Sequence, residues 1–397
     1  MTLNRNHLAT ICLHVAVASM VFGSFFHHTP GLMWAGLGLL LLSWPLMPPM
    51  REYQKPMLNC ILPFSLVATA SLIWSVNPDI TLSFLKREIL PPLLIVLLLA
   101  GRHSERLLAT ATLSGFAAIA LALFLYQPGL PELLNTWQHE LRYYDPGVGD
   151  LSTVLLLALP LAMLSRPAKG PLRVLFILLW TTLILYTAWL TSNRMFWAAL
   201  AVALLIYTPL SGKFSSRQVG VALAGIAVLV FLVSVNTPKS GGLQGDQLQK
   251  LENTYTRDVR WQIWDYWMEV IAERPVLGYG YGRDLSADYN HVDKARHPVA
   301  KHPLVSHAHN IFLNIYASVG LPGLLAFLYM IAGVARQFMG GLGLAATRKS
   351  AVTGLLLLTI MLVKNLTDDF YTRGPLILFW VLLVLAWNHM HTRMRQT

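Results

Sequence analysis

Long apolar runs recur along most of the chain, and they limit its fold more than any other feature. A helix of about 20 apolar residues spans the roughly 30 Å hydrocarbon core of a bilayer. Because unpaired backbone groups are costly in lipid, such a run crosses the membrane as a helix. Twelve runs qualify, at approximately 8–26, 31–47, 57–74, 81–100, 107–126, 150–165, 173–191, 195–210, 218–235, 311–335, 350–366 and 374–391. The sequence therefore predicts an all-α polytopic membrane protein with about twelve transmembrane helices.

Composition supports a membrane protein and argues against other classes. Only 12% of residues are charged and the mean hydropathy is +0.52, whereas soluble domains carry about 25% charged residues. The net charge of +11 would suggest nucleic acid in a soluble protein, but the basic residues are scattered among loops. We therefore expect anionic membrane lipids as partners and no nucleic acid. Cys12 and Cys60 both lie in apolar runs, which argues against a disulfide framework.

The lysines and arginines of the short loops predict the orientation, since such residues gather on the cytoplasmic side. Residues 1–235 then hold spans one to nine, 236–310 form a long periplasmic loop with an active-site lid, and 311–397 hold spans ten to twelve. Both termini are cytoplasmic in this arrangement, and the long loop faces outward, which is into the periplasm if the cell is Gram-negative and the membrane is its inner one. Six basic residues depart from the pattern and are candidate anion ligands: Lys86, Arg87, Arg142, Arg194, Lys364 and Arg373.

The stretch from Ser306 to Asn314 places two histidines and an amide where the long loop returns to a membrane span. Histidine takes up a proton near neutral pH more readily than other side chains, so His307 and His309 are candidate bases. Asn310 follows directly and could orient the second ring. The alternative is that both rings rest at the membrane interface, where amphipathic side chains gather.

Three outer cations are candidate phosphate ligands. A span that ends near residue 100 buries Lys86 and Arg87 about 8 Å below the outer surface, where charges usually face a cavity or a partner. Alternatively, Glu88 neutralises both and their side chains extend to the surface. Arg194 follows a turn so short that spans seven and eight form a tight hairpin, and its donor fork suits a phosphate. It could also extend to lipid headgroups.

The long loop contains one patterned segment, from Arg257 to Glu273. Its apolar residues recur every three or four positions and form a tryptophan-rich face: Trp261, Trp264, Met268 and Ile271. We expect an amphipathic helix on the membrane surface, ended by Pro275. Arg257 and Arg260 at its start face either the predicted phosphate site or lipid phosphates. Residues 284–305 are predicted to form an irregular polar lid.

Several motifs give the chain a resemblance to a known family. They are Ser-Asn-Arg after span seven, Arg-x-x-x-Trp followed by Arg-Pro-Val-Leu-Gly-Tyr-Gly, His-Ala-His-Asn-Ile-Phe-Leu, and Gly-Leu-Pro-Gly-Leu. With the polytopic layout, these motifs resemble the O-antigen ligase and polymerase superfamily, most specifically between residues 190 and 325. A ligase of that family moves a glycan from undecaprenyl diphosphate to a sugar hydroxyl of the lipid A core, at the periplasmic face and without nucleotide or metal.

The resemblance implies roles for individual residues. The family's histidine–asparagine pair falls on His309 and Asn310, its hairpin arginine on Arg194, and its loop arginine on Arg260 or Arg257. His309 would be the base, the arginines would hold the diphosphate, and direct displacement would invert the anomeric carbon. Ala308 departs from the family, in which this position is often Ser.

The remaining candidate substrate contacts are His307, Lys86, Arg87, Asp368 and Asp369. The two aspartates, in the last outer loop, could orient the histidine or bind sugar hydroxyls, or they could form a solvated loop pair. The resemblance implies no cofactor and no metal. The expected partners are the undecaprenyl-diphosphate-linked glycan donor and the lipid A core acceptor, and we expect a monomer.

Loop lengths and motifs of the sequence distinguish a ligase from a polymerase, a protein-glycosylating enzyme, a transporter and a zinc hydrolase. Polymerases of the superfamily commonly have two large outer loops, and relatives that glycosylate proteins often extend at the C-terminal side, whereas here residues 127–149 and 367–373 are short. Both features favour a ligase. A transporter would have matched interrupted spans in two halves, and the sequence has no such repeat. A zinc hydrolase is possible because His307-x-His309 can bind metal, but no His-Glu-x-x-His motif accompanies it.

Overall fold

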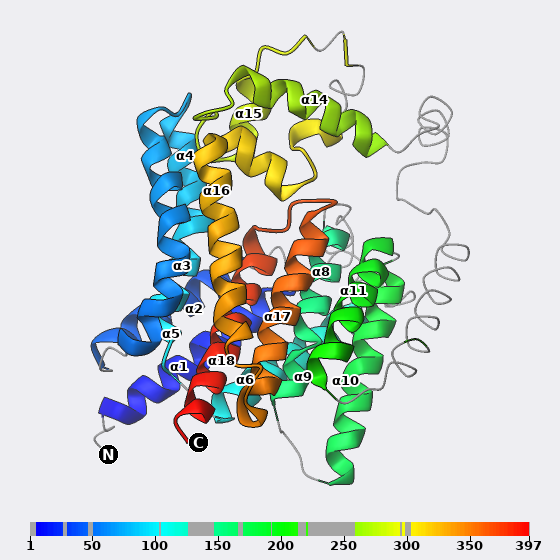
Figure 1. The fold of residues 1–397 in the computed structure, drawn as a ribbon. Coiled ribbons are helices and arrows are strands. Elements are labelled where there is room, and N and C mark those ends of the chain that lie inside the picture. Colours follow the sequence, from blue (N-terminus) through cyan, green and yellow to red (C-terminus); the bar gives the residue numbers. More distant parts are fainter. Residues whose placement is uncertain are drawn as a thin grey trace.

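The computed structural model describes residues 5–26, 30–46, 51–102, 105–125, 147–165, 170–191, 193–212, 220, 259–293, 296–297 and 303–396. Within these ranges the chain is helical and contains no strand (Figure 1). The predicted all-α class is confirmed. Seven helices are long and apolar enough to cross a membrane. They are α1 (Arg5–Gly23), α3 (Arg51–Ala70, extended by the turn η2, Ser71–Ile73), α6 (Glu105–Leu125), α10 (Pro171–Leu190), α16 (Ile311–Met339), α17 (Ala345–Asn365) and α18 (Arg373–Met394).

The predicted count of twelve spans is confirmed only in part. Three predicted spans form apolar helices that are shorter, namely α2 (Pro30–Ser43), α8 (Gly147–Ala158) and α11 (Arg194–Ser211). The predicted span 218–235 lies outside the described residues. The one remaining span, 81–100, is an interrupted helix.

This interrupted helix consists of α4 (Pro78–Phe84), a π-helical turn η3 (Leu85–Ile89) and α5 (Leu90–Leu99). Pro91 and Pro92 follow the turn and lack the N–H groups that would bond to carbonyls four residues earlier. Regular α-helical pairing therefore fails there. A π-helical turn is often found at a functional site, and this one contains Glu88, which is buried.

The tight hairpin predicted between spans seven and eight is present, because α10 ends at Leu190 and α11 begins at Arg194. Asn193 caps α11, and its side-chain Oδ1 accepts a hydrogen bond from the Phe196 N–H at 3.1 Å. An asparagine at this position satisfies one of the donors at the start of a helix. The cap therefore fixes where the backbone of Arg194 begins the helix.

α18 forms the core of the bundle, since every residue from Gly374 to Met390 is buried. α1, α5, α8 and α17 pack against it. An enclosed helix cannot shift without disturbing its neighbours, because protein interiors are close-packed. The loop 366–372 between α17 and α18 is therefore held at both ends, and it carries Asp368 and Asp369.

A second apolar cluster lies at one end of the bundle, where α14 (Val259–Glu273) and α15 (Arg283–Tyr289) are found (Figure 1). The predicted helix is confirmed. Trp267 and Val270 are fully buried against loop and α16 residues, whereas Trp261 and Met268 of the tryptophan-rich face are exposed. The placement of that face on a membrane surface stays a prediction. The predicted irregular lid is wrong at its start, where α15 is helical.

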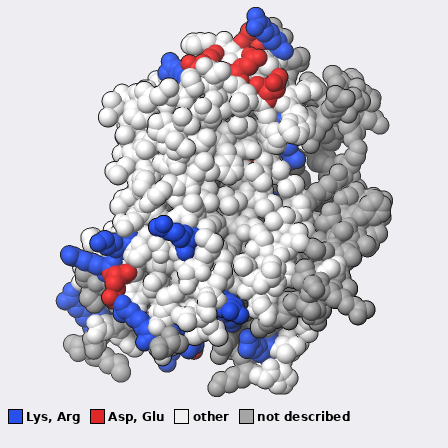
Figure 2. All heavy atoms as spheres, viewed as in Figure 1, with Lys and Arg blue, Asp and Glu red and all other residues white. Residues whose placement is uncertain are grey.

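Charged side chains gather at the two ends of the bundle, and the middle of this face has few (Figure 2). Figure 2 shows most lysine and arginine side chains of this face at the end where both termini lie, and a group of acidic side chains at the opposite end. We refer to these as the termini end and the α14 end.

Candidate active site

Two histidines share one carboxylate at the α14 end. His309 Nδ1 lies 3.0 Å from Asp368 Oδ1, and His307 Nε2 lies 3.2 Å from the same oxygen. The centroids of the two rings are 4.0 Å apart, and all three side chains are half-buried. The structure thus brings together predicted residues from two separate segments of the chain.

The protonation of this cluster follows from its contacts. Burial raises the pKa of the Asp368 carboxyl, but hydrogen bonds from His307 and His309 outweigh burial and hold that pKa well below its usual range. An ionised carboxylate only accepts hydrogen bonds, so His309 donates from Nδ1 and His307 from Nε2. The basic nitrogen of His309 is then Nε2. That of His307 is Nδ1, which lies 3.3 Å from the Ser306 hydroxyl.

Asn310 fixes the backbone that presents His309. Its Oδ1 accepts hydrogen bonds from the N–H groups of Phe312 and Leu313 at 2.9 and 3.3 Å and so caps α16. Its Nδ2 donates to the Leu366 carbonyl at 3.2 Å. His309 has a φ of +48°, a left-handed conformation that costs an L-residue roughly 1–2 kcal/mol. Asn310 ties the start of α16 to the end of α17 and therefore orients His309 through the backbone.

A chain of polar contacts supports the cluster from the bundle. Asn314 Oδ1 accepts from the Ala308 N–H at 2.7 Å, between the two histidines, and its Nδ2 donates to Asp369 Oδ2 at 2.8 Å. Arg283 forms ion pairs with Asp369 at 3.6 Å and with Glu88 at 3.1 Å. Loss of one member of a buried network leaves the others unpaired, which is costly. The side chains of Arg283, Asp369 and Asn314 thus connect Glu88, in the π-helical turn, to the backbone between the two histidines.

Arg283 and Asn314 are not among the site residues predicted from the sequence. Two signals could have found them. Glu88 lies inside a predicted span, where an acidic side chain usually needs a partner, and Arg283 is that partner. Asn314 is a polar residue in the first turn of an apolar span.

Lys86 and Arg87 are exposed, whereas Glu88 in the same turn is buried. Arg87 Nε donates to the Ser83 carbonyl at 3.3 Å. Glu88 pairs with Arg283, which corrects the expectation that it neutralises Lys86 and Arg87. A direct contact of these two cations with substrate stays a prediction.

The buried Lys364, at the end of α17, joins three parts of the site. Its Nζ donates to Ser152 Oγ at 2.9 Å and to Asn193 Oδ1 at 3.4 Å. It also lies within electrostatic range of Asp368 and Arg260. A buried charge in a membrane helix is rare and usually functional. In the sequence this residue is recognisable only as an outer cation.

Two of the three predicted arginines can be placed. Arg260 lies in the first turn of α14 and is half-buried. Arg194 begins α11, one residue after the Asn193 that bonds to Lys364. The Arg194 side chain and the whole of Arg257 lie outside the described part of the chain. Lys364 therefore contacts the residue before α11 and lies within electrostatic range of the first turn of α14.

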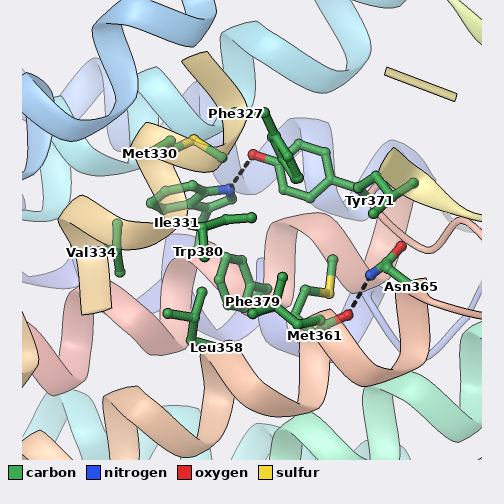
Figure 3. A pocket seen from close by; sticks show the side chains of 12 residues that line it. Phe327, Met330, Ile331, Val334, Leu358, Met361, Asn365, Tyr371, Phe379 and Trp380 are labelled. Atoms are coloured by element: carbon green, nitrogen blue, oxygen red, sulfur yellow. Dashed lines mark hydrogen bonds between the residues drawn. The ribbon is translucent and has the colours of Figure 1, made fainter. Parts of the chain in front are cut away.

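An apolar pocket adjoins the cluster between α16, α17 and α18, and it is seen from close by in Figure 3. Trp380 Nε1 donates to the Tyr371 hydroxyl at 3.2 Å, and Asn365 Nδ2 donates to the Met361 carbonyl at 2.7 Å. Asn365 Oδ1 accepts from the Phe370 N–H at 2.6 Å. The polar groups of this pocket are engaged within the protein, so the pocket forms an apolar floor under the loop 366–372.

The histidine cluster also has a geometry that suits a metal. One ligand atom each of His307, His309 and Asp368 lies within 4.8 Å of the others. Imidazole and carboxylate groups are common ligands of zinc. The geometry therefore permits both a general base and a divalent ion, and the expectation of a metal-free site stays a prediction.

The fold and the cluster together define a class, a multi-pass helical membrane protein with a histidine–carboxylate pair and a buried cation at one end. The family described as O-Antigen ligase matches residues 151–328, which include Arg194, Arg260 and both histidines. The O-antigen ligase of Salmonella typhimurium strain LT2 is 26% identical over 314 aligned residues, and the match covers 73% of this chain and 72% of that protein. Over residues 151–328 the chain is thus similar to the O-antigen ligase family, and the resemblance read from its motifs is confirmed.

Proposed function

We propose that the chain ligates an O-antigen glycan from undecaprenyl diphosphate onto a sugar hydroxyl of the lipid A core. The observation that carries the proposal is the pairing of His309 with Asp368 in a chain similar to the O-antigen ligase family. Glycosyl transfer from a diphosphate needs a base for the attacking hydroxyl and positive charge near the leaving group. A histidine held by a carboxylate, with the buried Lys364 and the half-buried Arg260 as nearby basic residues, supports both requirements.

In the proposed reaction, His309 Nε2 removes the proton from the acceptor hydroxyl as the hydroxyl oxygen attacks the anomeric carbon. The bond from that carbon to the diphosphate oxygen breaks, and its electron pair leaves with undecaprenyl diphosphate. Such a direct displacement inverts the anomeric carbon. Asp368 keeps His309 in the required tautomer and stabilises the imidazolium, as the carboxylate of a catalytic triad does.

Arg194 and Arg260 stabilise the leaving diphosphate in this proposal. Arginine is permanently charged, and its donor fork matches two phosphate oxygens. Asp369 is engaged by Asn314 and Arg283, so we assign it to positioning and not to sugar binding. His307 shares the carboxylate of Asp368, and we keep it as a candidate substrate contact. The proposal uses no cofactor and no metal.

We further propose that the reaction occurs at the periplasmic face of the inner membrane, with residues 236–310 outside and both termini in the cytoplasm. The gathering of basic residues at the termini end supports this orientation (Figure 2). The histidine cluster lies at the other end.

Deletion in a Gram-negative host tests the function. Cells without the protein should accumulate glycan on lipid diphosphate and display lipopolysaccharide that lacks O-antigen, and the wild-type chain should restore it. Accumulation of single lipid-linked repeat units would instead indicate a polymerase. Loss of glycan from a protein, with normal lipopolysaccharide, would indicate a protein O-oligosaccharyltransferase.

A further inference from the structure

A cavity of about 720 Å³ lies between α10, α11, α17 and the short helix α9 (Leu161–Leu164). It is remote from the histidine cluster. Most of its lining side chains are apolar, among them Ile177, Leu200, Leu204, Val352, Leu356 and Ile360. The volume lies within the range of ligand-binding pockets. Its walls resemble the hydrocarbon core of a bilayer, so an apolar chain is the kind of ligand that they suit.

The basic residues of the cavity lie at its termini end. Arg173 is in the first turn of α10, Ser211 ends α11, and Arg348 and Lys349 are near the start of α17. These three helix ends lie together because α10 and α11 form a hairpin (Figure 1). Arg348 Nε donates to the Leu342 carbonyl at 2.9 Å, which holds its guanidinium at the mouth. The cavity therefore has a basic mouth and an apolar interior.

The depth of the cavity corresponds to one leaflet. Its lining residues extend along α17 from Arg348 to Ile360, a rise of about 18 Å at roughly 1.5 Å per residue. Along α11 they extend from Ser211 to Leu200, or about 17 Å on the same basis. Half of a roughly 30 Å hydrocarbon core is about 15 Å. A lipid with its headgroup at the mouth places an acyl chain along the whole apolar wall.

A smaller cavity of about 250 Å³ adjoins the first at Ala345 and Lys349 and extends the space at the mouth. None of the described residues that line either cavity is acidic. Arg393, which lines the smaller one, is paired with Glu105 at 3.2 Å. The charge that favours an anion therefore comes from Arg173, Arg348 and Lys349.

We propose that this cavity binds one anionic phospholipid from the leaflet at the termini end. The phosphate lies between Arg173, Arg348 and Lys349, and one acyl chain lies between α10, α11 and α17. A zwitterionic phospholipid also carries a phosphate, but its cationic group offsets the attraction of the basic mouth, and free phosphate leaves the apolar interior unfilled. The site goes beyond the proposed glycosyl transfer, and its test measures lipid binding alone.

Native mass spectrometry of the delipidated full chain in detergent tests the proposal. Phosphatidylglycerol should bind at one per chain and about tenfold or more tighter than phosphatidylcholine, and inorganic phosphate should not compete. The variant with both Arg173→Gln and Arg348→Gln should lose about tenfold or more in affinity. Ala203→Phe, which fills the apolar wall, should weaken both lipids. The matched control Arg51→Gln removes an exposed cation at the start of α3 and should bind as the wild type does.

Equal affinity for the two phospholipids, or unchanged binding by the double variant, would overturn the proposal. Preference for a polyprenyl phosphate would overturn it in favour of an isoprenoid lipid. Should the variants fail to fold, a phosphatidylglycerol with a photoreactive acyl chain can be crosslinked to the wild type. Labels on α11 and α17 peptides near Leu204 and Leu356 support the site, and labels confined to the outer surface of α10 exclude it.

Discussion

His309 Nδ1 and Asp368 Oδ1 lie 3.0 Å apart, although the two residues are separated by 59 positions in the chain. The carboxylate stands on the loop between α17 and the buried α18, whereas the histidine precedes α16. The candidate base is thus oriented by a group on a rigid support. Its activity depends on how the α14 end packs against the bundle.

His309→Ala should abolish glycan transfer while the protein remains folded and inserted. Loss of a general base lowers the rate by about a hundredfold or more. The measurement is transfer from undecaprenyl diphosphate to lipid A core by purified protein, with the unfolding temperature as a check on folding. His307→Ala is the matched control and should retain more activity. The reverse order of the two variants would assign the base to His307.

Asp368→Asn should lower the rate about as strongly, because the neutral amide no longer fixes the histidine tautomer. The low pKa of Asp368 in the folded protein also predicts a pH dependence. A carboxyl with a lowered pKa stabilises the fold above its unfolded value of about 4, and this contribution is lost as the pH falls further. The difference in unfolding temperature between wild type and variant should persist from pH 8 to about pH 5 and shrink only below about pH 4. A difference that vanishes near pH 6 would contradict the assignment.

Arg194→Lys should fail to support transfer although the charge is kept. A lysine is a point charge and cannot form two parallel hydrogen bonds to neighbouring phosphate oxygens. Initial rates with a lipid-diphosphate donor test this, and Arg51→Lys, an exposed position at the start of α3, serves as the control. Near-normal turnover would indicate that Arg194 only attracts lipid headgroups.

Lys364→Met should reduce transfer by on the order of tenfold or more, since small displacements of catalytic groups are costly. The change removes the contacts with Ser152 and Asn193 and the charge beside Asp368. The rate is compared with that of Arg336→Met, which removes an exposed cation of α16 at the termini end. A folded Lys364→Met protein with the wild-type rate would leave this lysine with no part in the reaction.

Transfer should continue in excess EDTA. Permanently charged arginines in a partly shielded cavity can stabilise a diphosphate without a divalent ion. Zinc would in addition activate a bound water and favour hydrolysis over transfer. The assay is glycan transfer by detergent-purified protein with and without the chelator. If activity disappears and returns only with zinc, magnesium or manganese, His307, His309 and Asp368 are metal ligands.

The helices can be predicted from the sequence because a continuous run of apolar residues marks each of them. Hydropathy also detects the hairpin at Arg194, since its turn is only a few residues long. It does not detect the break in the run 81–100, because the π-helical turn depends on Pro91 and Pro92 and on burial of Glu88. Hydropathy also does not predict which face of α14 is buried within the protein. That face is set by Tyr279 and Ala308, which pack against it from outside the helix.

Site residues can be predicted from the sequence where they are adjacent in the chain, as His309 and Asn310 are. Its supporting contacts join distant segments. Asn314 and Asp369 are 55 positions apart, and Glu88 and Arg283 are 195 positions apart. Such pairs depend on tertiary packing and have no local pattern. The role of Asp368 therefore stays open from sequence, and the contact with His309 supports the orienting role.

The π-helical turn at Leu85–Ile89 has a consequence for insertions and deletions. Consecutive residues of an α-helix are separated by about 100° around its axis. Removal of one residue from the wide turn would restore a regular helix and rotate everything on one side of it by about that angle. Glu88 would then turn away from Arg283, while an exposed neighbour such as Arg87 would turn inward. A change of one residue in the length of this turn therefore decides whether an acidic or a basic side chain faces the interior.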